Sequence, residues 1–298
     1  MSRAVRARGR PSKFDYSRVT VTFDSDGDSC VGWLYRPDRP ADAPVVVMAG
    51  GLALPRETLA PLAERYAARG YAVFVFDYRG VGDSEGTPRN LVSPARADAD
   101  WAVAVERVRD LDGVDSRRLV LWGHSLGGTS ALATAADDPR VRGVVALGPV
   151  LSGTGLLRTR PLPAVGKALL AGVRDRVQGV LPRVGPHTVP AVGGDDDLAL
   201  VSDTGVRAAY ERLADVPDDP ARSFLALAGA GVDLDGLRCP ALFLAGSDDT
   251  VAPATAIEDA ADAHAGATFI RMPVTHFGLL DDAAVFEHTL VFLDGLFD

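Results

Sequence analysis

The chain has 298 residues, of which 47% are hydrophobic and 24% are charged, a balance that excludes collagen-like, disordered and disulfide-scaffold classes. The net charge of −9 comes from 33 Asp and 7 Glu against 29 Arg and 2 Lys, which fits a GC-rich genome or a high-salt cytoplasm and disfavours nucleic acid as a partner. Cys30 and Cys239 lie far apart, so we expect no disulfide, no metal site and no cofactor.

Residues 1–18 are expected to form a flexible arm. This segment has several arginines but no apolar core of a secretion signal. No later stretch of about 18 apolar residues predicts a membrane span. We therefore expect a cytoplasmic protein that acts on a small molecule, and the oligomeric state stays open.

The next elements alternate between strands and helices. Residues 19–23 and 30–35 predict an antiparallel hairpin, because the turn-rich segment 24–28 joins them. Short apolar runs typical of strands buried on both faces follow at 45–49, 72–76, 118–122, 144–147, 241–245 and 268–272. Helical patterns occur at 57–68, 95–110, 126–136, 254–264 and 281–296. This alternation predicts an α/β fold with a doubly wound, mostly parallel sheet of about eight strands.

An insertion of 89 residues, 149–237, interrupts this alternation. Apolar residues at helical spacing between 165 and 180 and a second helical pattern at 206–213 predict a helical cap over a core formed by 19–148 and 238–298. The first helix also fits a membrane surface, but Arg174, Asp175 and Arg176 mix charge signs and favour the cap. The acidic run 195–197 is interpreted as a solvated loop rather than a cation site.

The segment Gly123-His124-Ser125-Leu126-Gly127 follows an apolar strand and opens a helix. A serine hydroxyl needs a strained strand-to-helix turn, a base and oxyanion donors to act as a nucleophile. The small neighbours Gly123 and Gly127 leave room for such a turn around Ser125. The pattern predicts a nucleophile elbow, with the backbone N–H of Leu126 as one oxyanion donor.

The base is sought among five histidines. His124 is expected to point away from the Ser125 hydroxyl because neighbouring side chains on a strand alternate. The other three, His187, His264 and His288, fall in the insertion or in predicted helices. His276 follows the last strand directly and so emerges at the same sheet edge as Ser125, which favours it as general base.

An acid must orient the imidazole, and it should also follow a strand. The strand at 241–245 leads into Gly246-Ser247-Asp248-Asp249. The Gly-X-X-Asp spacing favours Asp249, while Asp248 stays a competitor. The second oxyanion donor is expected after the strand at 45–49, where Gly50 and Gly51 let the backbone approach a substrate, and we assign it to the N–H of Leu52.

With the order Ser125, Asp249, His276, the chain resembles the α/β-hydrolase superfamily, in its serine esterase and peptidase-like branch with a cap after strand six. Residues 76–84, Phe-Asp-Tyr-Arg-Gly-Val-Gly-Asp-Ser, are similar to the family's loop after the fourth strand, which the resemblance implies is structural. Relatives usually have His-Gly where this chain has Gly50-Gly51. The donor N–H survives this change, but the histidine that packs beneath the loop is missing.

The function expected from these residues is hydrolysis of a carboxylic ester through an acyl-enzyme. The same triad also serves amide or thioester cleavage and acyl transfer, and the sequence does not separate these reactions. A non-catalytic binding protein of the same fold is a further alternative, since folds do not fix functions. Labelling of Ser125 by a fluorophosphonate would separate an enzyme from a receptor with an unactivated serine.

Overall fold

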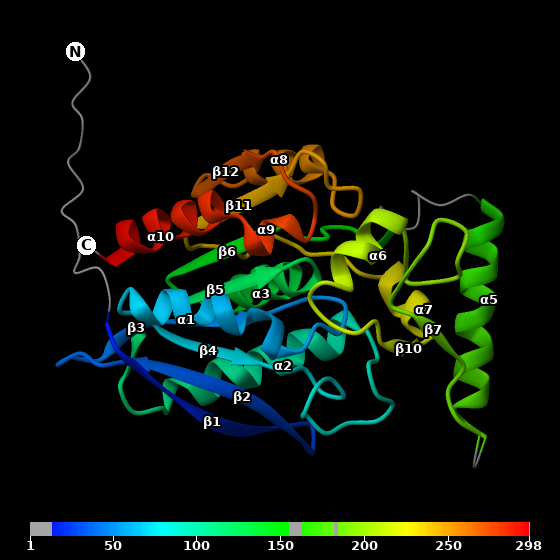
Figure 1. Cartoon of the computed structure of the whole chain (residues 1–298), viewed down its shortest axis with the longest axis horizontal. Helices are drawn as coiled ribbons and strands as arrows, with labels where there is room; N and C mark the ends of the chain where they lie inside the picture. The colour runs from blue at the N-terminus through cyan, green and yellow to red at the C-terminus, as the bar shows by residue number, and fades with distance from the viewer. Residues whose placement is uncertain (1–13, 155–161, 182–183, 298) are drawn as a thin grey trace.

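The computed structural model describes residues 14–154, 162–181 and 184–297. Its centre is an eight-stranded sheet with the strand order β1-β2-β4-β3-β5-β6-β11-β12 (Figure 1). The strands are β1 (Tyr16–Ser25), β2 (Asp28–Pro37), β3 (Ala43–Ala49), β4 (Ala72–Phe76), β5 (Val114–His124), β6 (Gly143–Leu147), β11 (Ala241–Gly246) and β12 (Ala267–Met272). Within this sheet only the pairs β1/β2 and β2/β4 are antiparallel, which confirms the predicted fold class.

Helices flank this sheet, as the alternation predicts (Figure 1). The helices outside the insertion are η1 (Arg56–Leu59), α1 (Ala60–Ala68), α2 (Pro94–Arg109), α3 (Leu126–Asp137), α8 (Ala254–Asp262), α9 (Gly278–Asp281) and α10 (Ala283–Phe297). Every residue of β3, β4, β6 and β11 is buried, because helices cover both faces of these strands. None of the described helices is both long and apolar enough to cross a bilayer.

Several predicted boundaries are wrong. The arm was expected to extend to residue 18, but Phe14 N donates to Ala68 O at 2.8 Å and β1 already begins at Tyr16, while residues 1–13 lie outside the described part. The predicted helix 281–296 begins two residues later, as α10 at Ala283, and the short helix α9 that ends at Asp281 is not predicted. Asp282 Oδ1 accepts the N–H groups of Ala284 and Val285, so its side chain caps a new helix there.

The insertion is more mixed than the predicted helical cap. It contains α5 (Leu162–Gln178), α6 (Thr204–Tyr210) and α7 (Ser223–Ala228), and also the short strands β7 (Thr188–Pro190), β8 (Val192–Gly193), β9 (Val201–Ser202) and β10 (Asp218–Pro220). These elements gather on one side of the sheet, with α5 outermost (Figure 1). In the acidic loop, Asp195 and Asp197 accept the N–H groups of Thr204 and Gly194.

Candidate active site

The turn between β5 and α3 has the strained geometry that the elbow requires. Ser125 has φ 58° and ψ −127°, a conformation that L-residues rarely adopt. Its N–H donates to Leu147 O at 2.8 Å, which ties the turn to the end of β6. A Cβ atom at Gly123 would lie 2.2 Å from Gly127 O, and one at Gly127 would lie 2.4 Å from Gly50 O, so neither position has room for a side chain. The tight turn therefore depends on these glycines.

His276 and Asp249 meet in the interior. His276 Nδ1 lies 2.7 Å from Asp249 Oδ2, and both side chains are almost fully buried. The other carboxylate oxygen, Asp249 Oδ1, accepts the N–H groups of Val251 and Ala252 at 2.8 Å each. Burial alone would raise the pKa of Asp249, but the His276 ring and the two N–H donors outweigh it, so the pKa lies below its ordinary value. The carboxylate is ionised and accepts Nδ1–H.

Asp248, the competitor for this role, lies elsewhere. Its side chain is exposed, and its Oδ1 accepts the hydroxyl of Ser247 at 3.3 Å. Its backbone N–H donates to Val274 O. The geometry therefore pairs His276 with Asp249.

Two atoms of the predicted catalytic residues are buried without a hydrogen-bond partner among the described residues. They are Ser125 Oγ and His276 Nε2. Gly148 links the surroundings of these two atoms. A Cβ atom built on Gly148, directly after the β6 residue that binds Ser125 N, would lie 3.2 Å from both His276 Nδ1 and Asp249 Oδ2. The strand ends thus bring the elbow and the His276–Asp249 pair together.

His124 contributes more than the sequence indicates. Its Nε2 lies 3.0 Å from His276 O, and the two rings are 4.7 Å apart. A carbonyl only accepts, so Nε2 carries the proton, while Nδ1 has no partner in the described part of the chain. Burial, aided by the nearby His276, lowers the pKa of His124 to about 3 and keeps it neutral. The predicted direction of His124, away from the Ser125 hydroxyl, stays a prediction, but its contact with His276 is one that the sequence does not indicate.

The remaining histidines lie away from these groups. His264 follows α8, its Nε2 lying 3.1 Å from Cys239 O, and His288 is exposed on α10. His187 N donates to Asp175 in the insertion.

The loop after β3 forms a tight turn against the elbow. Leu54 N donates to Gly51 O at 3.1 Å, and the two central residues, Leu52 and Ala53, have φ values of 50° and 53°. Because C=O and N–H point in opposite directions across a trans peptide, this bond turns the Leu52 N–H away from the turn interior. A Cβ atom on Gly51 would lie 2.8 Å from Leu126 N. The two N–H groups assigned as oxyanion donors are thus on adjoining segments.

Two tyrosines hold this loop in place of the missing histidine. Tyr78 donates its hydroxyl to Gly50 O at 3.0 Å, and Trp101 Nε1 donates to Tyr78 in turn. From the insertion, Tyr210 of α6 donates to Leu52 O at 3.1 Å. Tyr210 also packs edge-on against Phe277, the residue after His276. These contacts fix the loop from both sides, a role for Tyr210 that no sequence spacing indicates.

The loop at 76–84 is structural, as expected. Asp77 is fully buried, accepts Arg56 N at 2.6 Å and pairs with the Arg56 guanidinium. Ser84 Oγ donates to Asp77 O at 2.9 Å. Arg79 pairs with Asp100 at 2.6 Å beside a pocket described next.

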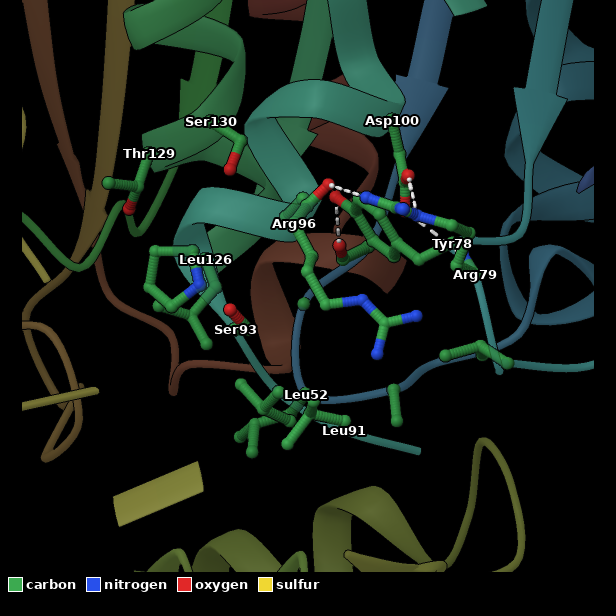
Figure 2. A pocket seen from close by; sticks show the side chains of 17 residues that line it. Leu52, Tyr78, Arg79, Leu91, Ser93, Arg96, Asp100, Leu126, Thr129 and Ser130 are labelled. Atoms are coloured by element: carbon green, nitrogen blue, oxygen red, sulfur yellow. Dashed lines mark hydrogen bonds and ion pairs between the residues drawn. The ribbon is translucent and has the colours of Figure 1, made fainter. Parts of the chain in front are cut away.

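A pocket adjoins the elbow (Figure 2). Its cavity volume is about 40 Å³, which becomes about 540 Å³ when the open solvent at its mouth is counted, and its lining joins Leu52 and Leu126 at one end to the first turn of α2. Apolar side chains dominate this lining, with Ser93, directly before α2, and Arg96 of α2 pointing into it (Figure 2). Among the described residues, no cluster of three or more His, Cys, Asp or Glu side chains is placed to hold a metal ion.

The family model for serine aminopeptidases (S33), an α/β-hydrolase family, matches residues 40–271, most of the chain. This chain is an α/β hydrolase of that family. The hydrolase is 34% identical to the quorum-quenching protein AidA of Acinetobacter baumannii over 244 residues, which cover 79% of this chain and 80% of AidA.

Two further similar proteins differ in how much of the chain they cover. A thiohydrolase, apmlB of Arthrinium phaeospermum, is 38% identical over 183 residues, 59% of this hydrolase and 55% of that protein. Among solved structures, DcsB in complex with a substrate analogue superposes with a TM-score of 0.82 at 26% identity, covering 94% of this chain and 99% of that one. The superfamily resemblance predicted from the sequence is confirmed.

Proposed function

We propose that this hydrolase cleaves a carboxylic ester through an acyl-enzyme on Ser125. Ser125 Oγ attacks the ester carbonyl carbon while His276 Nε2 takes the hydroxyl proton. The N–H groups of Leu52 and Leu126 stabilise the oxyanion. His276 then gives its proton to the leaving alcohol as the C–O bond breaks. A water molecule then attacks the acyl-enzyme while His276 takes its proton. The acyl–oxygen bond breaks, the carboxylic acid leaves, and His276 returns the proton to Ser125 Oγ.

One observation carries this proposal. The buried His276–Asp249 hydrogen bond of 2.7 Å stands next to the elbow, where Ser125 Oγ and His276 Nε2 have no partner among the described residues. An ionised Asp249 holds the proton on Nδ1, which leaves the Nε2 lone pair free to act as a base. The same carboxylate stabilises the imidazolium that forms during attack.

The test uses p-nitrophenyl acetate and butyrate. We expect Ser125→Ala to lower kcat by at least about 10³-fold, because the attacking atom is removed while the fold is retained. Thr154→Ala, which removes an exposed hydroxyl in the insertion, serves as a control and should keep wild-type turnover. Equal turnover by wild type and Ser125→Ala would contradict the proposal.

Thioester cleavage is the second candidate, favoured by the similarity to a protein named a thiohydrolase. The same residues serve both reactions, because the tetrahedral intermediate needs the same base and the same oxyanion donors. Matched butyryl esters of an alcohol and of the corresponding thiol separate the candidates. If kcat/KM for the thiol ester exceeds that for the alcohol ester by more than the ratio of their uncatalysed reactivities, thioester cleavage is favoured.

A further inference from the structure

The pocket beside the elbow has polar groups that the proposed chemistry leaves unused. Under the proposed function, on which this inference rests, the substrate carbonyl lies between Leu52 and Leu126. Both residues line the pocket, whereas neither Ser125, between them and the base, nor His276, which must meet the leaving group, does. The acyl chain therefore enters the pocket and extends toward the first turn of α2.

Ser93 stands at the N-cap position of α2 but does not cap the helix. Its side chain accepts no hydrogen bond from the helix N–H groups, although serine at this position usually does. Figure 2 shows its hydroxyl directed into the pocket, near Leu126 and Leu52. The hydroxyl is therefore available to a bound molecule.

Arg96, one turn along the same helix, has spare donors. Its guanidinium group reaches into the pocket beyond Ser93 toward Leu91 (Figure 2). Arg96 Nη2 lies 3.9 Å from Asp28 Oδ2, which is close enough for an ion pair but too far for a hydrogen bond. Arg79 differs, because its side chain donates to both Asp100 and Asp26. Arg96 thus has donors that the described residues leave unused.

We propose that Ser93 and Arg96 recognise a neutral carbonyl oxygen on the acyl chain, so that the preferred substrates are esters or thioesters of oxo-substituted acids. The apolar lining accommodates the hydrocarbon part of the chain. A carboxylate is disfavoured, because the three acids Asp26, Asp28 and Asp100 already outnumber the two arginines beside the pocket. A ketone accepts hydrogen bonds without adding charge.

The test compares kcat/KM for methyl octanoate, its 3-oxo and 5-oxo derivatives, and the half-ester of octanedioic acid. We expect the wild type to prefer one oxo ester over the plain ester by about tenfold, typical of a hydrogen bond from a charged donor. Arg96→Met and Ser93→Ala should lower kcat/KM for that oxo ester by about tenfold more than for the plain ester. Comparing each variant with the wild type removes the intrinsic reactivity of the oxo ester. Arg107→Met, on the far end of α2 and outside the pocket, should keep the wild-type preference.

Each other outcome has a distinct meaning. Equal loss on oxo and plain esters, or no oxo preference in the wild type, contradicts this inference alone. Preference for the half-ester contradicts the neutral carbonyl. If the wild type hydrolyses none of these esters and no p-nitrophenyl ester, the proposed function fails and the inference fails with it.

A second, independent observation concerns the outer surface of α5. Leu162, Leu170, Val173 and Val177 are at least half exposed, at 87%, 71%, 50% and 57%. At about 100° per residue these four fall within roughly 80° of the helix circumference, so they form one apolar stripe. Figure 1 shows α5 as the outermost element of the insertion.

The exposed charges on α5 are all positive. Lys167, Arg174 and Arg176 are exposed and flank the stripe, while Asp175 is fully buried and pairs with Arg222 at 2.6 Å. Of the mixed charges at residues 174–176, only the two positive ones are therefore exposed at the surface. Although the chain carries a net charge of −9, this helix presents a basic and apolar face.

We infer that α5 docks this hydrolase on an anionic lipid surface. Apolar side chains flanked by cations fit the boundary between acyl chains and negatively charged headgroups. Two copies packed symmetrically through this stripe would bring like charges together, which disfavours a dimer here.

The test is sedimentation of the full chain with vesicles. We expect binding to phosphatidylglycerol vesicles, several-fold less to phosphatidylcholine vesicles, and loss of binding in 0.5 M salt. Leu170→Asp combined with Val177→Asp should abolish binding, whereas Val291→Asp, at an exposed valine of α10, should not. Absence of binding by the wild type, unchanged binding by the double variant, or a dimer that this variant dissociates would overturn the inference.

Discussion

Asp248 and Asp249 are neighbours in the chain with opposite environments. Asp249 is buried against His276, and Asp248 is exposed. Under the proposed mechanism, Asp249→Asn lowers kcat by about 10³ to 10⁴-fold, since an amide cannot hold the imidazole in the required tautomer or stabilise its charged form. Asp248→Asn should stay within about threefold of the wild type. Ester hydrolysis at pH 7 measures both, and a larger loss in Asp248→Asn would reverse the assignment.

Gly51 leaves space where the oxyanion is proposed to bind. A Cβ atom there would lie 2.8 Å from Leu126 N and 2.9 Å from Ser125 Cβ, so the loop must shift. We predict that Gly51→Ala lowers kcat by at least about 10²-fold, as removal of an oxyanion donor does. Gly295→Ala, where the added methyl group meets open space, is the matched control. If Gly51→Ala keeps the wild-type kcat, the assignment of the Leu52 and Leu126 N–H groups as oxyanion donors is contradicted.

Asp219 makes folding stability depend on pH. It is fully buried, and neither carboxylate oxygen has a hydrogen-bond partner in the described chain. Burial first, and the charge of Asp218 second, raise its pKa to about 8. The unfolded chain releases this proton above about pH 4, but the folded chain retains it to about pH 8, so the wild type loses stability as pH rises between these values.

Asp219→Asn removes this titration. The melting temperature of the variant relative to wild type should therefore rise between pH 5 and pH 8, by about 2–4 °C for each kcal/mol gained. The difference should be constant above pH 8. Asp215→Asn, at an exposed site, should give no such trend. A difference that does not change with pH would show that Asp219 is ionised in the folded protein.

At the scale of residues, the sequence predicts site residues best where they lie just after the end of a strand. Ser125, Asp249 and His276 each follow a strand of the parallel sheet, so their meeting follows from chain order and topology. His124, Tyr210 and Ser93 could not be found this way. Their contacts depend on side-chain directions and on how the insertion packs, and neither leaves a periodic signal.

At the scale of elements, α6 is tied to the loop after β3 by one hydroxyl. Tyr210→Phe removes the 3.1 Å hydrogen bond to Leu52 O and leaves that carbonyl without its donor. We predict a loss of about three- to tenfold in kcat/KM for esters, consistent with the net value of one hydrogen bond that positions the loop. Tyr16→Phe, on the edge strand β1, is the control. Unchanged kcat/KM in Tyr210→Phe would mean that the loop is held without α6.

Element prediction succeeded where burial is continuous. The six apolar runs match β3, β4, β5, β6, β11 and β12 in order. In β3, β4, β6 and β11 every residue is buried, and strands buried on both faces need unbroken apolar sequence. The predicted burial of the last run on both faces is wrong, because only Met272 of the edge strand β12 is buried. It failed at ends that single side chains decide, such as the Asp282 cap before α10. The strands of the insertion have two or three residues each, too few for any alternation to be visible.

For the whole molecule, the fold and family follow from the sequence, but the division into core and cap stays a prediction. Ser125 lies more than 100 residues before both Asp249 and His276 in the chain, and the parallel sheet collects all three at one edge. Substrate choice depends on the pocket and the insertion, whose packing no motif encodes. The sequence therefore predicts the hydrolase family but not the substrate.

The central claim is that His276 activates Ser125. Fluorophosphonate labelling followed by mass spectrometry of the intact protein and its peptides tests this most directly, because only an activated serine reacts stoichiometrically. We predict one adduct per chain, on the peptide that contains Ser125, and none in His276→Ala under the same conditions. A wild type that stays unlabelled, or an adduct on another residue, would contradict the account.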